Sequence, residues 1–185
     1  MRCAVDIAPI RAEPRDDAEQ VTQALAGEPI TVDERRDGWA RVRTAYDYPG
    51  WMREEHLEDG DGALPEPRSG STIDEARSYL GTVYEWGGLT ARGIDCSGLV
   101  HMAYRRLGRI VPRDADQQED AGAEVDEPRP GDLVTYGEPD KAADHIAFWL
   151  GDGRILHSTG RDDLGVVEED EPQSLLERRR KIVRL

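Results

Sequence analysis

The stretch GIDCSGLVHMAYRRLG, residues 93–108, contains the cysteine around which the second half of the chain is organised. Apolar residues recur at helical spacing from Leu99 onward, and Gly108 follows the last basic turn. Asp95 occupies the N-cap position, so Cys96 falls in the first turn of a helix. The N–H groups at a helix start favour a thiolate, whereas the neighbouring carboxylate opposes it. Two interpretations stay open: a small buried side chain, or a nucleophile that needs a base.

Among the four histidines of the chain, His145 and His157 are the best candidates for that base. They lie in DHIAFWLGDGRILHST, residues 144–159, which is typical of a β-hairpin. Depending on the loop register, the two side chains are either directly opposite or diagonal neighbours, and both registers place them on one face. Of the others, His101 is turned roughly 140° away from the cysteine on the same helix, and His56 follows charged residues at the surface.

A thiol nucleophile requires a base to take its proton, and the base requires a third polar group that fixes its orientation. Cys96, His145 and His157 can supply these three parts from a helix start and two adjacent strands. A zinc site is not expected, because the sequence has no CxxC or HExxH pattern and no convincing fourth ligand. We therefore expect no metal and no organic cofactor.

Composition narrows the class of protein. The 185 residues are 37% hydrophobic and carry a net charge of −15, which argues against binding to nucleic acid or to an anionic membrane surface. The basic run ERRRK, residues 177–181, is interpreted as a solvated helix end or strand edge. No apolar run reaches the ~20 residues of a membrane span, and the start lacks the apolar core of a secretory signal. The two cysteines could form one disulfide, but a reducing, cytoplasmic setting is the better expectation.

Turn residues and period changes divide the chain. Residues 1–60 contain short alternating strands between tight turns, which predicts a small β-barrel. Residues 61–70 are rich in acid, Gly and Pro and are expected to form a linker. Residues 71–185 begin with helices and continue with strand-like runs, which indicates an α+β domain.

The first helix of that domain is predicted over residues 71–81. Thr72 and Glu75 have the spacing of a capping box, and Gly81 is the expected stop.

Four motifs together resemble a known family: YEWGG (84–88), DCSGLV (95–100), DHIAFWLGDG (144–153) and LHST (156–159). They are similar to those of the NlpC-type papain-like cysteine peptidases, which hydrolyse peptidoglycan stem peptides. Residues 1–60 are similar to the bacterial SH3-like domain that precedes this peptidase in one subgroup. Enzymes of that subgroup act on free murein peptides and cut between γ-D-Glu and the diamino acid, either meso-diaminopimelate or Lys.

The resemblance implies roles for the catalytic residues. Cys96 would be the nucleophile, His145 the general base and His157 its orienting partner. Asp95 and Ser97 match positions that bind the free amine of the substrate's L-Ala.

It also implies further substrate contacts. Tyr84 matches a tyrosine that lines the site, and Asp114 matches an acidic contact, although the following position, often Ser, is alanine here. From the first domain, Glu19 and Tyr48 are the best matches to a Glu and a Tyr that close the cleft, with Tyr46 a rival to Tyr48.

The function expected from this resemblance is that of a cytoplasmic, monomeric endopeptidase of murein recycling. Its substrate would be a murein tripeptide or tetrapeptide with a free N-terminal L-Ala, and the identity of the third residue stays open. Two alternatives are a papain-like acyltransferase or amidase acting on another small substrate, and a non-catalytic module that binds the cell wall.

Overall fold

The computed structural model describes the whole chain, residues 1–185, as two compact units, Met1–Glu66 and Pro67–Leu185. The first unit is a small β-rich SH3-like body, and the second is an α+β body of helices and an antiparallel sheet. This confirms the predicted fold class. Residues 61–69, which belong to the stretch expected to be a linker, contain no helix or strand.

The first unit is built on a five-stranded antiparallel sheet of order β3-β2-β6-β5-β4. Its elements are β1 (Arg2–Cys3), β2 (Ile7–Arg11), β3 (Gln20–Leu25), β4 (Thr31–Arg36), β5 (Trp39–Arg43), β6 (Pro49–Arg53), the short 3-10 helix η1 (Glu54–His56) and β7 (Leu57–Glu58), which pairs with β1. Alternate residues of these strands point inward and form one core with Ile10, Val42 and Met52 fully buried. The β4–β5 turn is Asp37-Gly38, both with positive φ, as a tight hairpin requires.

A six-stranded antiparallel sheet of order β10-β15-β11-β12-β13-β14 forms the frame of the second unit. Its strands are β10 (Ala123–Glu124), β11 (Leu133–Tyr136), β12 (His145–Gly151), β13 (Arg154–Thr159), β14 (Gly165–Asp170) and β15 (Arg179–Arg184). The small pair β8 (Leu89–Thr90) and β9 (Gly93–Ile94) lies apart from this sheet. Strand β11 and the Ile146–Phe148 part of β12 are buried because both of their faces are covered.

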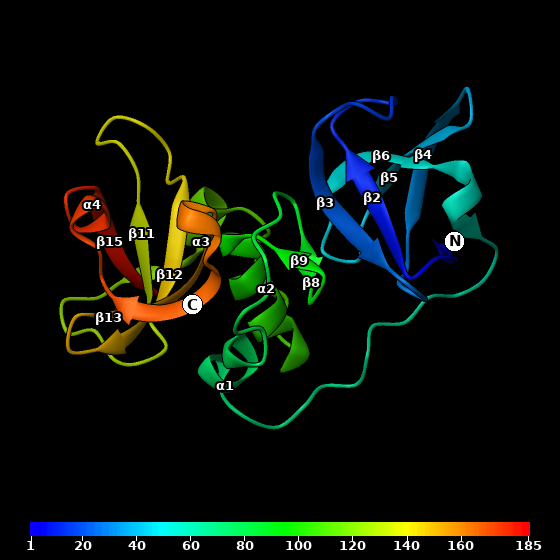
Figure 1. The fold of residues 1–185 in the computed structure, drawn as a ribbon. Helices are drawn as coiled ribbons and strands as arrows, with labels where there is room; N and C mark the ends of the chain where they lie inside the picture. Colours follow the sequence, from blue (N-terminus) through cyan, green and yellow to red (C-terminus); the bar gives the residue numbers. More distant parts are fainter. The chain divides into compact units, whose positions relative to one another are not determined.

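Helices cover the two faces of this sheet (Figure 1). They are α1 (Thr72–Arg77), α2 (Cys96–Arg106), α3 (Ala115–Ala121) and α4 (Gln173–Leu176), with the 3-10 turn η2 (Arg161–Asp163) before β14. Helix α2 packs against β12, where the rings of Tyr104 and Phe148 stack with centroids 6.4 Å apart. On the other face, Leu175 of α4 packs on the cluster formed by Val134, Tyr136, Ala147 and Ile155.

Two local predictions for the helices were wrong. The N-cap of α1 is Ser71, whose hydroxyl accepts from the Asp74 N–H at 3.2 Å, and not Thr72. The helix also ends at Arg77, because the chain turns there to bury Tyr79, over which the Arg106 guanidinium stacks at 4.6 Å. The polar helix α3 was not predicted at all.

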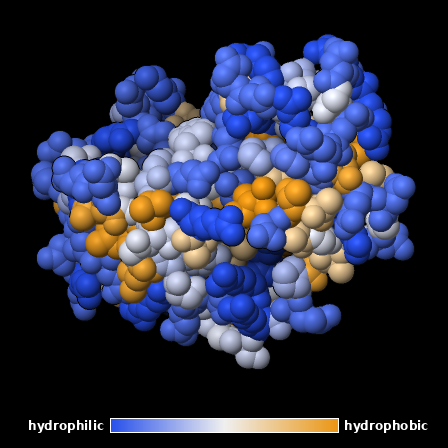
Figure 2. Space-filling model, turned by 45° about the vertical axis from the view of Figure 1, so that its right-hand side comes forward, coloured by the Kyte–Doolittle hydropathy of each residue, from blue (hydrophilic) through white to orange (hydrophobic).

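The surface is dominated by charge. On the face shown in Figure 2, hydrophilic residues cover most of the area and hydrophobic ones form small patches. The basic run 177–181 lies where α4 ends and β15 begins, but it is ion-paired and not simply solvated: Arg178 pairs with Asp144, Arg179 with Glu171, and Arg180 with Glu119. No helix in the chain has both the length and the apolar character needed to cross a membrane.

Candidate active site

Cys96 is the first residue of α2, and its thiol is buried with 6% of the residue exposed. The Asp95 carboxylate caps the helix by accepting from the Gly98 N–H at 2.6 Å, as predicted. The chain's other cysteine, Cys3, is also a free thiol, but it belongs to the core of the first unit.

Close backbone packing explains why glycines accompany the cysteine. A Cβ at Gly98 would lie 2.4 Å from the Gly88 carbonyl oxygen, and a Cβ at Gly88 would lie 2.5 Å from the Gly93 oxygen. Only glycine therefore fits where the YEWGG turn (84–88) meets the start of α2. The Gly87 N–H also donates to Asp95 Oδ2 at 2.7 Å, which ties this turn to the helix cap.

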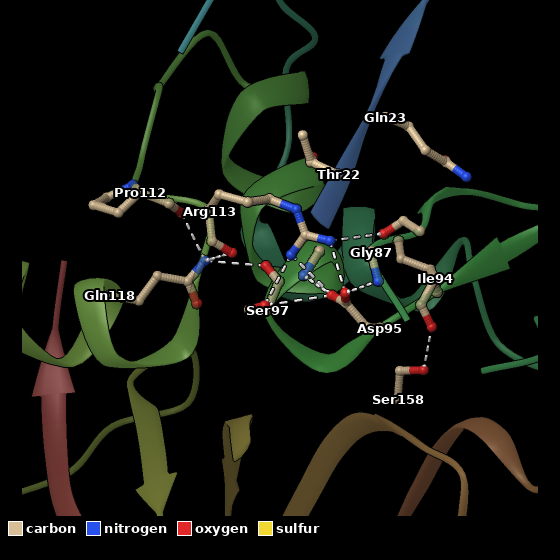
Figure 3. A network of polar contacts seen from close by, with 12 residues as sticks. Thr22, Gln23, Gly87, Ile94, Asp95, Ser97, Pro112, Arg113, Gln118 and Ser158 are labelled. Carbon is tan, nitrogen blue, oxygen red and sulfur yellow. Dashed lines mark hydrogen bonds and ion pairs between the residues drawn. The ribbon is translucent and has the colours of Figure 1, made fainter. Parts of the chain in front are cut away.

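A buried arginine that the sequence analysis missed completes the cap (Figure 3). Arg113 is 1% exposed, and its guanidinium donates to both oxygens of Asp95, at 2.9 and 2.7 Å. It also donates to Ser97 Oγ at 2.9 Å. Asp95 and Ser97, the predicted contacts for a substrate amine, are thus held in one buried ionic cluster beside the cysteine.

Helix α3 contacts both the first turn of α2 and the segment that carries Arg113. The buried Gln118 side chain donates to the carbonyl oxygens of Ser97 and Pro112, at 3.0 and 2.8 Å (Figure 3). Asp114, a predicted substrate contact, is the N-cap residue of α3 and lies next to Arg113; its carboxylate accepts from Gln117 at 3.3 Å. A string of polar residues such as ADQQEDA gives little periodic signal, which is why this helix escaped prediction.

The β12–β13 hairpin brings the two histidines together. Phe148 pairs with Leu156, so His145 and His157 are diagonal neighbours on one face, the second of the two predicted registers. Their rings meet edge to face with centroids 5.0 Å apart, and His145 Nε2 lies 2.7 Å from His157 Nδ1.

The hydrogen-bonded series continues beyond His157. His157 Nε2 lies 2.9 Å from Glu169 Oε1 on β14, and Arg161 donates to both oxygens of Glu169, at 2.8 and 2.5 Å. These bonds engage both ring nitrogens of His157 and Nε2 of His145. No group of three or more His, Cys, Asp or Glu side chains is placed to hold a metal ion.

Burial determines the protonation states of the Cys96 thiol and the His145 imidazole. Burial and the Asp95 carboxylate raise the pKa of the Cys96 thiol to about 12, although N–H groups of Ile146 and Ser97 at the sulfur partly oppose this. Burial, with His157 and nearby guanidinium groups, lowers the pKa of His145 to about 3. A neutral thiol and a neutral imidazole are therefore favoured at neutral pH.

Tyr84 lies beside this centre. It forms a bridge with Ile94, directly before the helix cap. Burial and the nearby Cys96 and Asp95 raise the pKa of its hydroxyl, which stays protonated and able to donate.

The predicted contacts from the first domain remain predictions. Glu19 is exposed directly before β3, and Tyr48 lies directly before β6. The rival Tyr46 is tied to its own sheet, because its hydroxyl bonds Thr22 Oγ1 and the Gln23 carbonyl at 2.8 and 3.0 Å.

A cavity of about 360 Å³ adjoins His145 on the side of α4. Its lining includes Asp144, Arg161, Arg178 and Leu175, and none of its residues belongs to α2. Arg178 donates to Asp144 at 2.5 Å, so the cavity presents both signs of charge.

Comparisons with known proteins agree with this geometry. The model of the NlpC/P60 family matches residues 81–178, and that of the bacterial dipeptidyl-peptidase SH3 domain matches residues 10–57. The chain belongs to the NlpC/P60 family, a family of cysteine peptidases. The resemblance on which the sequence analysis relied is thereby confirmed.

Named relatives of this NlpC/P60 chain are peptidases. It is 33% identical over 99 residues to a gamma-D-glutamyl-L-lysine dipeptidyl-peptidase of Bacillus cereus, covering 51% of this chain and 30% of that protein. It is 32% identical over 144 residues to dipeptidyl-peptidase 6 of Lysinibacillus sphaericus, covering 74% and 51%. The matched part of the chain thus corresponds to between 30% and 51% of the length of these relatives.

A solved NlpC/P60 structure from Bacillus cereus shares the fold of both units. It aligns over 99% of this chain and 62% of its own with a TM-score of 0.59 at 23% identity.

Proposed function

We propose that this chain is a cysteine endopeptidase that hydrolyses the bond between γ-D-Glu and the diamino acid of murein peptides with a free N-terminal L-Ala. The observation that carries the proposal is the 2.7 Å hydrogen bond between His145 and His157, on the strands next to the helix that begins at Cys96. The relatives named as gamma-D-glutamyl-L-lysine dipeptidyl-peptidases support the substrate class.

The reaction follows from the protonation states. His145 takes the thiol proton while the sulfur of Cys96 attacks the γ-carbonyl carbon, which forms a tetrahedral oxyanion. The N–H groups in the first turn of α2 have no partner within the helix and can donate to that oxyanion. His145 then gives its proton to the leaving amine as the C–N bond breaks. Water that His145 activates attacks the thioester carbon, which breaks the C–S bond, releases the γ-carboxylic acid and returns the proton to the Cys96 thiol. His157 holds the imidazole in the orientation that both transfers need.

Recognition of the free amine requires a carboxylate next to the cysteine. The Asp95 carboxylate already accepts hydrogen bonds from Arg113, Gly87 and Gly98, so its negative charge is largely compensated within the protein. We assign the more direct ammonium contact to Asp114, with Asp95 and Ser97 shaping the pocket, while Glu19 and Tyr48 keep their proposed roles from the resemblance. Because a blocked amine cannot supply the ammonium that would pair with Asp114, we expect the acetylated peptide to be cleaved poorly.

The charged cavity beside His145 suits the leaving residue. His145 protonates the leaving amine, so the third residue of the peptide has to lie next to it. The far end of meso-diaminopimelate carries an ammonium and a carboxylate, which match Asp144 and Arg178 respectively, whereas Lys offers only the ammonium. We therefore infer a preference for meso-diaminopimelate over Lys at this position.

The proposed setting is recycling of free murein peptides in the cytoplasm by a monomer. A buried, unpaired thiol such as Cys96 persists best under reducing conditions. Fractionation of cells followed by detection of the chain tests the location, and enrichment outside the cytoplasm would contradict it.

The chain offers its own matched control for the nucleophile. Cys96→Ala is expected to abolish release of L-Ala-D-Glu from L-Ala-γ-D-Glu-meso-diaminopimelate, measured by mass spectrometry, with an unchanged circular dichroism spectrum. Cys3→Ala, which removes the other buried thiol, is expected to keep turnover once it is folded. Full activity in Cys96→Ala would end the proposal. If an amide forms when an acceptor amine is supplied, the acyltransferase alternative gains instead.

A further inference from the structure

The hydrogen-bonded series that starts at His145 does not stop at the third residue expected of a catalytic triad. It runs from His145 on β12 through His157 on β13 to Glu169 on β14, over distances of 2.7 and 2.9 Å. His157 is 1% exposed and the side chain of Glu169 21% exposed. We propose that Glu169 is a positioning residue that sets the tautomers of both histidines and stabilises the positive charge that His145 acquires during the reaction.

The tautomers follow from the acceptor at the end of the series. Burial alone would raise the pKa of Glu169, but the hydrogen bonds from Arg161 and His157 outweigh it and keep the pKa below its usual value. An ionised carboxylate only accepts, so His157 Nε2 has to carry its proton. The neutral His157 then accepts at Nδ1, which requires that His145 Nε2 carries a proton as well. His145 Nδ1 is left as the basic nitrogen.

The register of β13 and β14 places Glu169, and not its neighbour Glu168, beside His157. Ile155 pairs with Glu169, so the carboxylate lies diagonally across from His157 and on the same face. The adjacent Glu168 points to the opposite face, where it pairs with Arg77 at 2.5 Å and Arg154 at 3.7 Å. Glu168 thus has the same charge at almost the same position in the sequence, without a contact to the histidines.

Other charges act on the same pair. The titratable and charged groups that face the histidines from the surrounding elements are Tyr136 (β11), Asp144 (before β12), Arg161 (η2), Glu169 (β14) and Arg178 (before β15). The Cys96 sulfur (α2) lies at the N–H of Ile146, the residue after His145. Arg161 opposes a charge on the imidazoles directly, and its bidentate bond to Glu169 reduces this effect. Removal of Glu169 therefore takes away a stabilising charge and leaves the Arg161 charge uncompensated.

The inference rests on the proposed cysteine chemistry, but its test does not need the peptide substrate. Iodoacetamide forms a bond to the thiolate sulfur and releases iodide, so site-resolved alkylation of Cys96 reports how readily the proton passes to His145. Glu169→Gln is expected to slow this alkylation at pH 7 by roughly tenfold, the equivalent of one pKa unit of the histidine pair. The deficit should shrink towards pH 10, where hydroxide removes the proton.

Two further variants separate this role from a general effect on the fold. Arg161→Gln is expected to change the rate at pH 7 in the opposite direction, and Glu168→Gln to leave it unchanged. An equal deficit at every pH, or an equal effect of Glu168→Gln, would overturn the proposal.

Nitrogen-15 NMR of the unmodified protein checks the tautomers directly. Both His145 and His157 are expected to be protonated at Nε2, and a proton on His157 Nδ1 would also overturn the proposal. If the proposed peptide is not cleaved but the alkylation and NMR results hold, only the substrate assignment fails.

Discussion

Arg113 and Asp95 are joined by two nearly parallel hydrogen bonds, Nη1 to Oδ1 at 2.9 Å and Nη2 to Oδ2 at 2.7 Å (Figure 3). Both side chains are buried, and Asp95 directly precedes Cys96 in the sequence. The carboxylate that caps α2 is therefore also the anchor of a buried cation. The position of Cys96 depends on both partners.

Loss of the cation should destabilise the second unit. Arg113→Met leaves the Asp95 carboxylate buried without its partner, which is expected to lower the free energy of unfolding in urea by about 3–5 kcal/mol. Arg109→Met is the matched control, because Arg109 is exposed and only stacks on Tyr104; it should cost about 1 kcal/mol or less. Equal stability of the two variants would contradict the role given to the pair.

His101 should make stability depend on pH in the range from 7 to 5. Burial lowers its pKa in the folded chain from 6.5 to about 3, so the unfolded chain binds a proton in this range and the folded chain does not. The free energy of unfolding should therefore fall as the pH falls, with a slope from His101 of up to about 1.4 kcal/mol per pH unit. Urea denaturation of His101→Gln should show a correspondingly flatter dependence, and an unchanged slope would refute the assignment.

The charged cavity predicts a selectivity that can be removed. Arg178→Gln should raise KM for the meso-diaminopimelate peptide by roughly tenfold, the size of one charge-assisted hydrogen bond, with kcat nearly unchanged and little effect on the Lys peptide. Lys141→Gln, at an exposed cation outside the cavity lining, is the control. A preference of the unmodified chain for the Lys peptide would contradict recognition of the third residue by the cavity. So would an equal rise in KM for both peptides in Arg178→Gln.

Much of the fold could be predicted because the period of apolar residues is clear. Alternation in HIAFWL and RILHST gave the hairpin, and helical spacing after Cys96 gave α2. The N-cap of α1 was misplaced by one residue, since Ser71 and Thr72 are both good capping residues and only packing chooses between them. Helix α3 is short and polar, so its existence depends on the contacts of Gln118 and not on a pattern.

The candidate site likewise contains residues that could be predicted from the sequence and residues that could not. Cys96 and the two histidines could be found from motifs and register, because a hairpin brings residues together in a regular way. Arg113 and Glu169 could not, since each lies among charged neighbours that resemble an ordinary solvated surface in the sequence. Their buried partners, Asp95 for Arg113 and His157 for Glu169, become visible only in the tertiary structure.

The most direct test of the central claim compares two peptides by mass spectrometry. One is L-Ala-γ-D-Glu-meso-diaminopimelate with a free amine, and the other is the same peptide acetylated at its N-terminus. We predict release of L-Ala-D-Glu from the first peptide only, with the cut at the γ-D-glutamyl bond and no cut by Cys96→Ala. Cleavage of both peptides would contradict recognition of the free amine, and cleavage of neither by a chain whose Cys96 still reacts with iodoacetamide would contradict the proposed substrate.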